Sequence, residues 1–145
     1  MKGLIQRVDR ASVSIDGELY SQIGNGLLVL LGVDKEDTIE NVYKLADKII
    51  NLRVFEDENE KMNLSLKDVG GELLVVSQFT LCGDTKKGTR PSFDKAAHPQ
   101  IANELYEEFL KYSAKFVKTV KHGKFGAMMK VSLVNDGPVT FMVEK

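Results

Sequence analysis

The polar run Ser77, Gln78, Phe79 and Thr80 is the stretch of this sequence whose residue types could do chemistry. It directly follows residues 73–76, Leu-Leu-Val-Val, a continuously apolar segment typical of a strand buried on both faces. Polar groups at the end of a buried strand need hydrogen-bond partners, either in the protein or in a bound ligand. The run therefore indicates a place where a substrate could be positioned, although partners within the protein would satisfy the same groups.

A glycine- and lysine-rich loop, residues 83–91, follows this run at once. Its cations are Lys86, Lys87 and Arg90. A rigid strand end that leads into a flexible basic loop is a common construction for a site that takes an anionic substrate. The loop shifts the interpretation of the polar run toward function.

Thr80 is the one side chain of the run that could act as a nucleophile, and a threonine hydroxyl needs a general base. The sequence has two histidines, His98 before Pro99 at an expected helix start and His122, and both are interpreted as structural or exposed. Cys82 has no obvious activating neighbour and is interpreted as a packing residue. No His, Cys or carboxylate spacing matches a metal site, so neither metal nor cofactor is expected.

A second motif, Asn-Asp-Gly-Pro-Val-Thr at residues 135–140, lies between two expected strands. All of Asn, Asp, Gly and Pro are turn residues, and on the residues alone a hairpin turn is favoured. The alternative is a cis peptide bond before Pro138, which costs little for an X-Pro pair and is usually found in a tight turn for a reason. Such a bond would bring two backbone carbonyls close together beside Gly137.

Composition places the chain among ordinary single-domain proteins. Its 145 residues fit one domain, 1–145, with a real hydrophobic core. Lys plus Arg is 20 and Asp plus Glu is 21, a net charge of −1 that argues against broad coating of nucleic acid. Recognition of one nucleic-acid end through a local basic patch stays possible.

The chain shows no sign of a secretory leader, because residues 1–8 are interrupted by Lys2, Gln6 and Arg7 and alternate like a strand. The longest apolar run, residues 27–31, is too short to span a membrane. Cys82 is the single cysteine, which excludes an internal disulfide and suits a reducing compartment. A cytoplasmic location is expected.

Hydrophobic periodicity predicts many short strands interrupted by two main helices. Strands are expected over residues 3–8, 11–15, 18–23, 27–33, 54–55, 62–66, 73–76, 116–120, 129–134 and 139–143. One helix is expected to end near Ile50 after a cap at Asp37 or Thr38, and another to begin at Pro99. The apolar face of the second helix is expected to carry Ile101, Ala102, Leu105, Phe109 and Tyr112. The pattern predicts an α+β domain built on a twisted, barrel-like antiparallel or mixed sheet.

Taken together at this spacing, the runs 77–81 and 135–140 closely resemble the two signature motifs of the D-aminoacyl-tRNA deacylases. The likeness covers essentially the whole chain, with further matching segments at residues 6–8, 26–33, 52–55, 61–63, 84–88, 90–93 and 123–127. Met128 departs from it, standing where an acidic residue is expected, and Cys82 and Gly83 replace an aromatic residue and an alanine. These differences concern the wall of the pocket.

The resemblance implies an enzyme that hydrolyses the ester between a D-amino acid and the 3′-terminal adenosine of tRNA. It also implies release of glycine from mischarged tRNA, and hence a role in proofreading during translation. The family acts as a homodimer, in which Gly137 and Pro138 would enter the partner subunit's pocket and exclude L-amino acids. An L side chain would meet the paired carbonyls, whereas hydrogen or a D side chain would point away.

For the chemical step, backbone N–H groups around Gln78, Phe79 and Thr80 are expected to polarise the ester carbonyl. Ser77 belongs to the same catalytic run. Water would attack with help from the 2′-hydroxyl of the terminal ribose, and Thr80 would position groups. The alternative mechanism makes Thr80 the nucleophile of an acyl-enzyme.

The resemblance also implies supporting roles outside the run. Arg7 would hold the incoming Gly-Pro loop through its backbone carbonyls, although a surface salt bridge is nearly as good an interpretation. Asn135 and Thr140 would support the same loop, and Phe125 and Met129 would help to wall the adenosine pocket.

The basic loop takes a more specific role under the same resemblance, with Lys86, Lys87 and Arg90 at phosphates of the tRNA 3′ end. Two other classes of function stay open. One is a non-catalytic module that binds an RNA end or a nucleotide through the same loop. The other is an interaction domain whose Gly-Pro loop is only a dimer contact.

Overall fold

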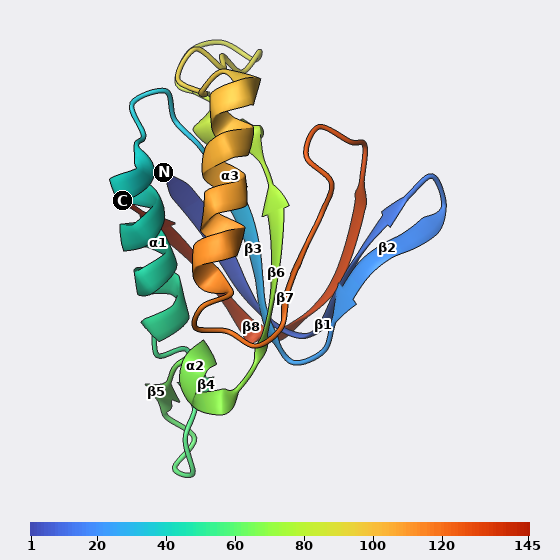
Figure 1. Cartoon of the computed structure of the whole chain (residues 1–145), viewed down its shortest axis with the longest axis vertical. Coiled ribbons are helices and arrows are strands. Elements are labelled where there is room, and N and C mark those ends of the chain that lie inside the picture. Colours follow the sequence, from blue (N-terminus) through green and yellow to red (C-terminus); the bar gives the residue numbers. More distant parts are fainter.

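A strongly bent mixed sheet organises the computed structural model, which describes residues 1–145 (Figure 1). Its strands run in the order β2-β1-β3-β6-β7, and β8 pairs with the other side of β1. Their bounds are β1 Lys2–Ile15, β2 Glu18–Ile23, β3 Gly26–Gly32, β6 Glu72–Ser77, β7 Val120–His122 and β8 Lys130–Glu144, with a separate small sheet of β4 Phe55–Glu56 and β5 Met62–Leu64. The helices are α1 Ile39–Asn51, α2 Leu66–Val69 and α3 Pro99–Ser113, with a short 3-10 helix η1 at Phe79–Cys82.

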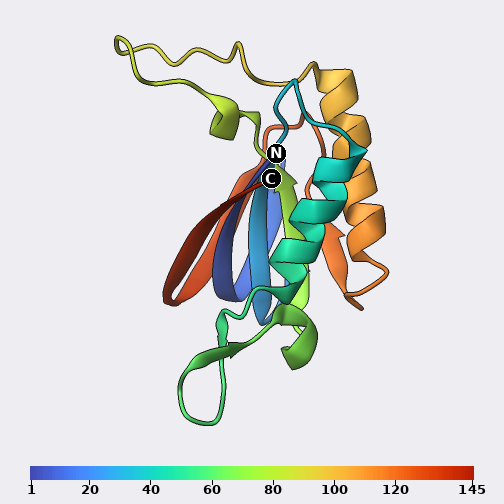
Figure 2. The ribbon, with the colours of Figure 1, turned by 90° about the vertical axis from the view of Figure 1, so that its left-hand side faces the viewer.

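The parallel strands β3 and β6 form the centre of the sheet and are buried on both faces, as predicted for both runs. Side chains on one face, such as Leu27 and Leu73, pack in the main core against α1 and α3. Those on the other face, such as Leu28 and Leu74, pack in a second core inside the curve of the sheet. The two helices cover one face only (Figure 2), so the sheet closes the second core by its own bending.

Both main helices begin where the sequence predicts. Thr38 is the N-cap of α1, and Pro99 occupies the first turn of α3 after the N-cap His98. On α3 the buried face is rotated from the expected one, with Tyr106 buried and Ile101 47% exposed. The single-domain α+β class with a nearly closed barrel-like mixed sheet is confirmed.

Two predicted strand pairs are single long strands. Residues 3–8 and 11–15 belong to one strand, β1, because Asp9 and Arg10 are not turn residues and the chain continues through them. Residues 130–134 and 139–143 likewise belong to one strand, β8, which pairs with β1 on both sides of residues 136–139, and Met129 lies just before it. Asn135 pairs with Val8 and Thr140 with Gln6, so residues 136–139 bulge out opposite a single residue. The hairpin interpretation of this motif is therefore wrong.

Two shorter predictions also differ. Residues 62–66 were expected as one strand, but β5 ends at Leu64, where Ser65 and Asp68 form a capping box that starts α2. The strand expected at residues 116–120 lies later, as β7, because the chain turns after α3 before it joins β6. No helix of the structure is both long and apolar enough to cross a membrane.

Leu73→Ala tests the buried character of β6. The side chain is fully buried in the main core, so its truncation should lower the free energy of unfolding by about 2–5 kcal/mol. Leu19→Ala is the matched control, because Leu19 is 59% exposed and its loss should change stability by less than about 0.5 kcal/mol. Urea unfolding measures both, and equal midpoints for the two variants would contradict the packing described here.

Candidate active site

The first motif begins where β6 leaves the sheet. Ser77 is the last residue of β6 and pairs with Leu31 of β3. The Gln78 N–H extends this pairing by one residue, donating to the Leu31 carbonyl at 2.8 Å. The chain then turns into η1, whose first residues are Phe79 and Thr80. The motif is thus a fixed strand end followed by a tight helical turn.

A largely apolar cleft of about 710 Å³ opens beside this strand end. Ser77, Gln78 and Phe79 line it, together with Phe125 and Met129 from the segment after β7. Its volume is that of pockets that hold a small organic ligand, and an adenosine would fit such a space. The structure therefore brings Ser77, Gln78 and Phe79 together with both residues expected to wall an adenosine pocket, whereas the exposed Thr80 is not among the residues that line the cleft.

The backbone donors of the motif are not equivalent. The Gln78 N–H is committed to Leu31, which corrects the expectation that it faces the substrate. Phe79 and Thr80 open η1, and the first N–H groups of a helix have no partner within it. Thr80 is exposed, and its hydroxyl oxygen accepts a hydrogen bond from the Gln78 side-chain amide. An amide N–H cannot remove a proton, so this contact does not activate the hydroxyl.

Neither histidine is arranged as a base for this hydroxyl. His98 lines the cleft, but its Nδ1 accepts the Gln100 N–H at 3.3 Å and caps α3. His122 is exposed at the end of β7, with its Nδ1 2.7 Å from the Gly123 carbonyl oxygen. No group of three or more His, Cys, Asp or Glu side chains is placed to hold a metal ion.

Cys82 ends η1 and is 1% exposed. Burial, followed by a hydrogen bond and charge repulsion from Asp34, raises the pKa of its thiol to about 12. The thiol is therefore neutral and poorly nucleophilic at physiological pH, in agreement with its interpretation as a packing residue.

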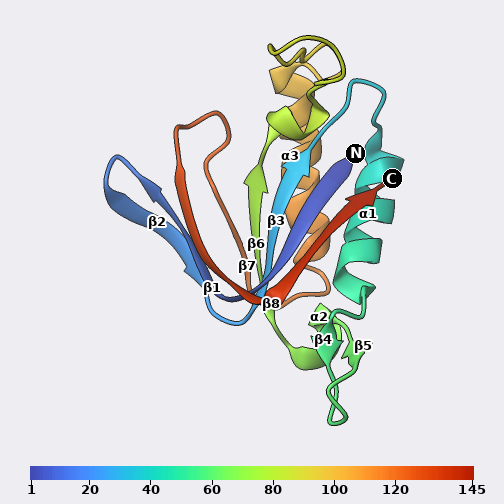
Figure 3. The ribbon, with the colours of Figure 1, turned by 180° about the vertical axis from the view of Figure 1, so that it is seen from behind.

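The Gly137–Pro138 loop lies at the opposite end of the sheet, and its peptide bond is cis. It bulges beside Arg7, which pairs with Leu27 of β3, whereas the first motif starts beside Leu31. Four residues of β3 separate these levels, which is at least roughly 13 Å. Figures 1 and 3 show the same separation, with the bend of β8 at one end of the sheet and the exit of β6 at the other.

Hydrogen bonds from the side chains of Arg7 and Asn135 fix the conformation of the Gly137–Pro138 loop. Asn135 donates to the Thr140 hydroxyl at 2.8 Å and accepts the Val139 N–H at 2.8 Å. Arg7 is 5% exposed, and its guanidinium donates to the Asp136 carbonyl at 3.1 Å and to the Val54 carbonyl at 2.8 Å. Arg7 also lies 3.3 Å from a carboxylate oxygen of Asp136 and 3.7 Å from one of Glu56, so this buried side chain makes ion pairs as well as backbone contacts. Within the protomer it holds its own Gly137–Pro138 loop, and its expected contact with a partner's loop stays a prediction.

Glycine is required at position 137 for two reasons. Its φ is +128°, a region that side chains rarely adopt. A Cβ there would also lie 2.7 Å from the Val139 side chain and 3.2 Å from Arg7 Nη2. Both Gly137 and Pro138 are exposed on the protomer.

The basic loop is separate from the cleft. Lys86 and Lys87 line a polar hollow of about 330 Å³, together with Lys95 and Asp84. Arg90 is exposed near the tip and lines neither space. Figure 2 shows this segment, between η1 and α3, extending well beyond the helices.

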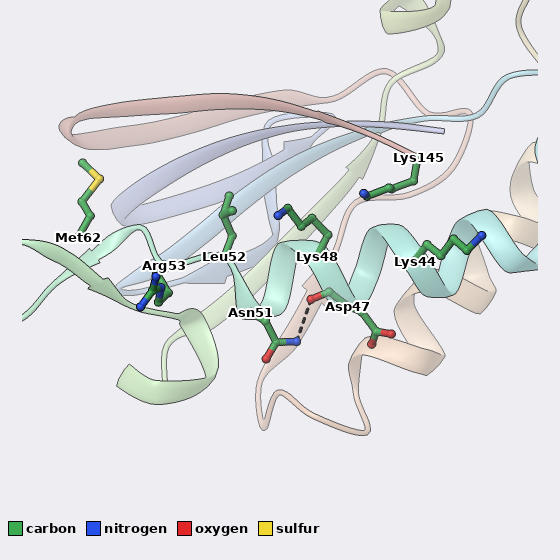
Figure 4. Close-up of a pocket in the computed structure, with 8 residues that line it drawn as sticks. All are labelled: Lys44, Asp47, Lys48, Asn51, Leu52, Arg53, Met62 and Lys145. Atoms are coloured by element: carbon green, nitrogen blue, oxygen red, sulfur yellow. Dashed lines mark hydrogen bonds between the residues drawn. The ribbon is translucent and has the colours of Figure 1, made fainter.

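A third hollow of about 690 Å³ runs along the outer side of α1 (Figure 4). Its lining is mostly charged, and Lys44, Lys48, Arg53 and Lys145 supply its cations. It contains no residue of either motif, so it is not the candidate active site.

Two aromatic residues of the site were not predicted from sequence. Tyr106 of α3 lies behind the end of β6, where its hydroxyl donates to the Val75 carbonyl at 3.0 Å, and burial raises the pKa of that hydroxyl. Its ring centroid is 5.9 Å from that of Phe125. Phe93, from the basic segment, contacts Phe79 and lines the cleft. Neither ring stands out in the sequence, because aromatic residues usually mark a core.

Fold and site together define an α+β protein with a nucleoside-sized cleft at one end of its sheet and a rigid outward-facing loop at the other. The model of the family described as D-Tyr-tRNA(Tyr) deacylase matches residues 4–144. A D-aminoacyl-tRNA deacylase of Thermodesulfovibrio yellowstonii is 56% identical over 143 residues, 99% of this chain and 98% of that protein. One from Pseudoalteromonas translucida is 60% identical over 141 residues, 97% of each chain.

Solved structures agree with this match. A structure titled c-Myc DNA Unwinding Element Binding Protein superposes with a TM-score of 0.96 at 46% identity, over 100% of this chain and 99% of that one. A probable eukaryotic D-amino acid tRNA deacylase shares the fold, with a TM-score of 0.84 at 18% identity over 99% and 98% of the chains. The chain therefore belongs to the D-Tyr-tRNA(Tyr) deacylase family. The predicted resemblance is confirmed, and with it the prediction of an enzyme, a deacylase that acts on aminoacyl-tRNA.

The neutral thiol of Cys82 gives a test of the local packing. Iodoacetamide at pH 8 should alkylate the folded protein at least about a hundredfold more slowly than the urea-unfolded chain, because a pKa of about 12 leaves almost no thiolate. Stability should also fall as the pH rises above about 8.5, where the unfolded thiol ionises and the folded one does not. Mass spectrometry follows the alkylation, and rapid labelling of the folded protein would contradict the buried position.

Proposed function

We propose that this protein hydrolyses the ester bond of D-aminoacyl-tRNA, and of glycine mischarged on tRNA, to release free tRNA and the amino acid. The observation that carries the proposal is the cleft of adenosine size, which Ser77, Gln78 and Phe79 line together with Phe125 and Met129. Charged tRNA is a cytoplasmic substrate, so we place the activity in the cytoplasm.

The position of the Gly137–Pro138 loop supports a homodimer. Within one protomer the loop is too far from the cleft to touch a substrate bound there. It is also exposed, and rigid because of Arg7 and Asn135. Near it β8 leaves one edge unpaired and exposes Phe141 and Met142, which are 43% and 48% exposed. Contact through this face would bring each loop into the other subunit's cleft.

Selection between enantiomers follows from the loop's backbone. Carbonyl oxygens that point into a pocket leave room for a hydrogen atom but collide with a side chain. An L-amino acid would direct its side chain into the carbonyls of residues 137 and 138, whereas a D-amino acid directs its side chain away. Rejection by collision needs no affinity for the accepted side chain, so many D-amino acids and glycine can share one pocket.

Hydrolysis then needs no acid–base pair of side chains. The Phe79 and Thr80 N–H groups would stabilise the negative charge that develops on the ester carbonyl oxygen. A water oxygen forms the new bond to the carbonyl carbon, and the bond from that carbon to the ribose 3′ oxygen breaks. The ribose 2′-hydroxyl would relay the proton to the departing 3′ oxygen. Thr80 would position its neighbours through the contact with Gln78.

The acyl-enzyme alternative and the non-catalytic alternative are weaker. A Thr80 nucleophile lacks a base, since the group that contacts its oxygen is an amide donor. A module that only binds RNA ends has no use for a rigid outward loop at the far end of the sheet. An interaction domain would not need an adenosine-sized apolar cleft.

Matched D-tyrosyl- and L-tyrosyl-tRNA test the activity itself. The protein should release D-tyrosine at a rate well above the spontaneous one and leave the L ester intact, as followed by loss of radiolabelled amino acid from tRNA. Binding without turnover would favour the RNA-binding module. Neither binding nor turnover would favour the interaction domain.

Two substitutions separate the mechanisms. Thr80→Ala should keep the single-turnover rate within about tenfold, because the hydroxyl only positions. Phe79→Pro should lower it by about 10²–10³-fold relative to Phe79→Ala, because proline removes one N–H donor and is tolerated at the first position of a helix. Loss of all activity in Thr80→Ala with intact tRNA binding would instead establish the covalent mechanism.

Arg7→Ala tests the support of the loop. The buried Val54 carbonyl and the Asp136 carbonyl would lose their donor, so the free energy of unfolding should fall by about 1–3 kcal/mol and the D-to-L rate ratio should drop. Arg10→Ala on the same strand is the control, because Arg10 is exposed. An unchanged D-to-L ratio in a folded Arg7→Ala protein would show that the loop does not select the enantiomer.

A further inference from the structure

Two exposed aromatic rings stand at the mouth of the cleft. Phe79 is 56% exposed and Phe93 is 39% exposed, although both line the same apolar space. Their ring centroids are 5.1 Å apart, and their planes meet at 62°, an edge-to-face pair. Large apolar side chains that stay exposed beside a binding cleft are informative, because burial would otherwise be favourable.

The backbone holds Phe93 in place even though it belongs to a long loop. Asp84 and Ser92 exchange two hydrogen bonds of 2.7 and 3.0 Å, which close the loop just before Phe93. The Phe93 carbonyl accepts the Ala96 N–H at 3.0 Å. The ring also packs on the end of η1, since a Cβ at Gly83 would lie only 3.1 Å from it. Phe93 is therefore a fixed platform.

Phe93 separates the apolar cleft from the cationic hollow. Its neighbours in the chain, Ser92 and Asp94, line that hollow together with Lys86, Lys87 and Lys95. Backbone donation from Lys86 and the charges of Lys95 and Lys86 lower the pKa of Asp84 in the same hollow. An apolar pocket, an exposed aromatic ring and a group of cations thus follow one another along the surface.

This order matches the chemistry of single-stranded RNA, in which bases stack on aromatic rings and cations meet the phosphates. We propose that Phe93, in edge-to-face contact with Phe79, is a stacking subsite for the base immediately 5′ of the terminal adenosine, and that Lys95 joins Lys86 and Lys87 at the adjoining phosphates. The subsite rests on the proposed function, because the terminal adenosine must occupy the cleft. Stacking of one base on an aromatic side chain corresponds to about a tenfold gain in affinity.

Binding of two uncharged probes tests the subsite without any catalytic step. Adenosine 5′-monophosphate fills only the cleft, whereas the RNA tetranucleotide 5′-ACCA-3′ also reaches Phe93. The protein should bind the tetranucleotide at least about tenfold more tightly, measured by calorimetry at fixed salt. Phe93→Leu, which keeps the apolar bulk and removes the aromatic face, should lose about tenfold for the tetranucleotide and less than about twofold for the mononucleotide.

Matched controls lie on other surfaces. Phe116→Leu removes a ring of similar exposure, 42%, that contacts Tyr112 away from the cleft, and it should change neither affinity. Lys95→Ala should reduce the slope of log affinity against log salt concentration by about one for the tetranucleotide, because one phosphate contact is lost. Lys48→Ala, in the hollow along α1 (Figure 4), should leave it unchanged.

The outcomes separate this subsite from the function on which it rests. If the tetranucleotide binds no more tightly than the mononucleotide, or if Phe93→Leu weakens both probes equally, the ring is only a wall of the adenosine cleft and the subsite is overturned. If the unsubstituted protein binds neither probe, the proposed function itself is contradicted, and the subsite with it.

Discussion

The pairing of β6 with β3 is the constraint on which the rest of the structure depends. Both strands are parallel and buried on both faces, so neither can slide along the other without moving apolar side chains out of two cores. The hydrogen bond from the Gln78 N–H to Leu31 carries this fixed register one residue beyond the sheet. The first motif is placed by that bond, and η1 begins at a defined point, where its first two N–H groups have no partner within the helix.

At the other end of the same sheet, pairing with β1 fixes the position of the Gly137–Pro138 bulge of β8. Strand β1 is paired on both sides, and β8 bulges opposite Arg7, with a second shift of register between Val8 and Arg10. The bulge of β8 is fixed by the buried guanidinium of Arg7 and is exposed on its other side. This position suits contact with a second molecule rather than with the same protomer. In the homodimer that we propose, each subunit would use both ends of its sheet, and every complete site would contain parts of two chains.

The elements that could be predicted from the sequence are those that a few neighbouring residues determine. The buried strands, the Thr38 cap and the start of α3 at Pro99 each follow from a few neighbouring residues, and all were predicted. The single strand β8 could not be predicted this way, because Asn135 to Pro138 are turn residues by type and only the long partner β1 keeps them in the sheet. Likewise, that Gln78 donates to Leu31 depends on a contact 47 residues away in the chain.

The site was predictable to a similar degree. Ser77 to Thr80, Phe125 and Met129 carry a motif that is visible in one sequence. Phe93 lies in the matching segment 90–93 but was given no role there, and Tyr106 lies in no motif. The position of each depends on how the loop after η1 and the helix α3 pack against the strand end. Arg7 was assigned to the correct loop, and the structure shows that it holds the loop of its own chain. Its expected contact with a partner's loop stays a prediction, since a sequence does not tell whether a contact lies within a subunit or between two.

Mixed dimers measure most directly whether the loop acts on the neighbouring subunit. One subunit carries Phe79→Pro, with an impaired cleft and an intact loop, and the other carries Gly137→Val, with an intact cleft and an altered loop. Each variant alone should lack rapid, D-selective hydrolysis, whereas the co-expressed mixture should recover it, because the intact cleft then meets the intact loop of its partner. A mixture of confirmed heterodimers that recovers no D-selective activity would contradict the account.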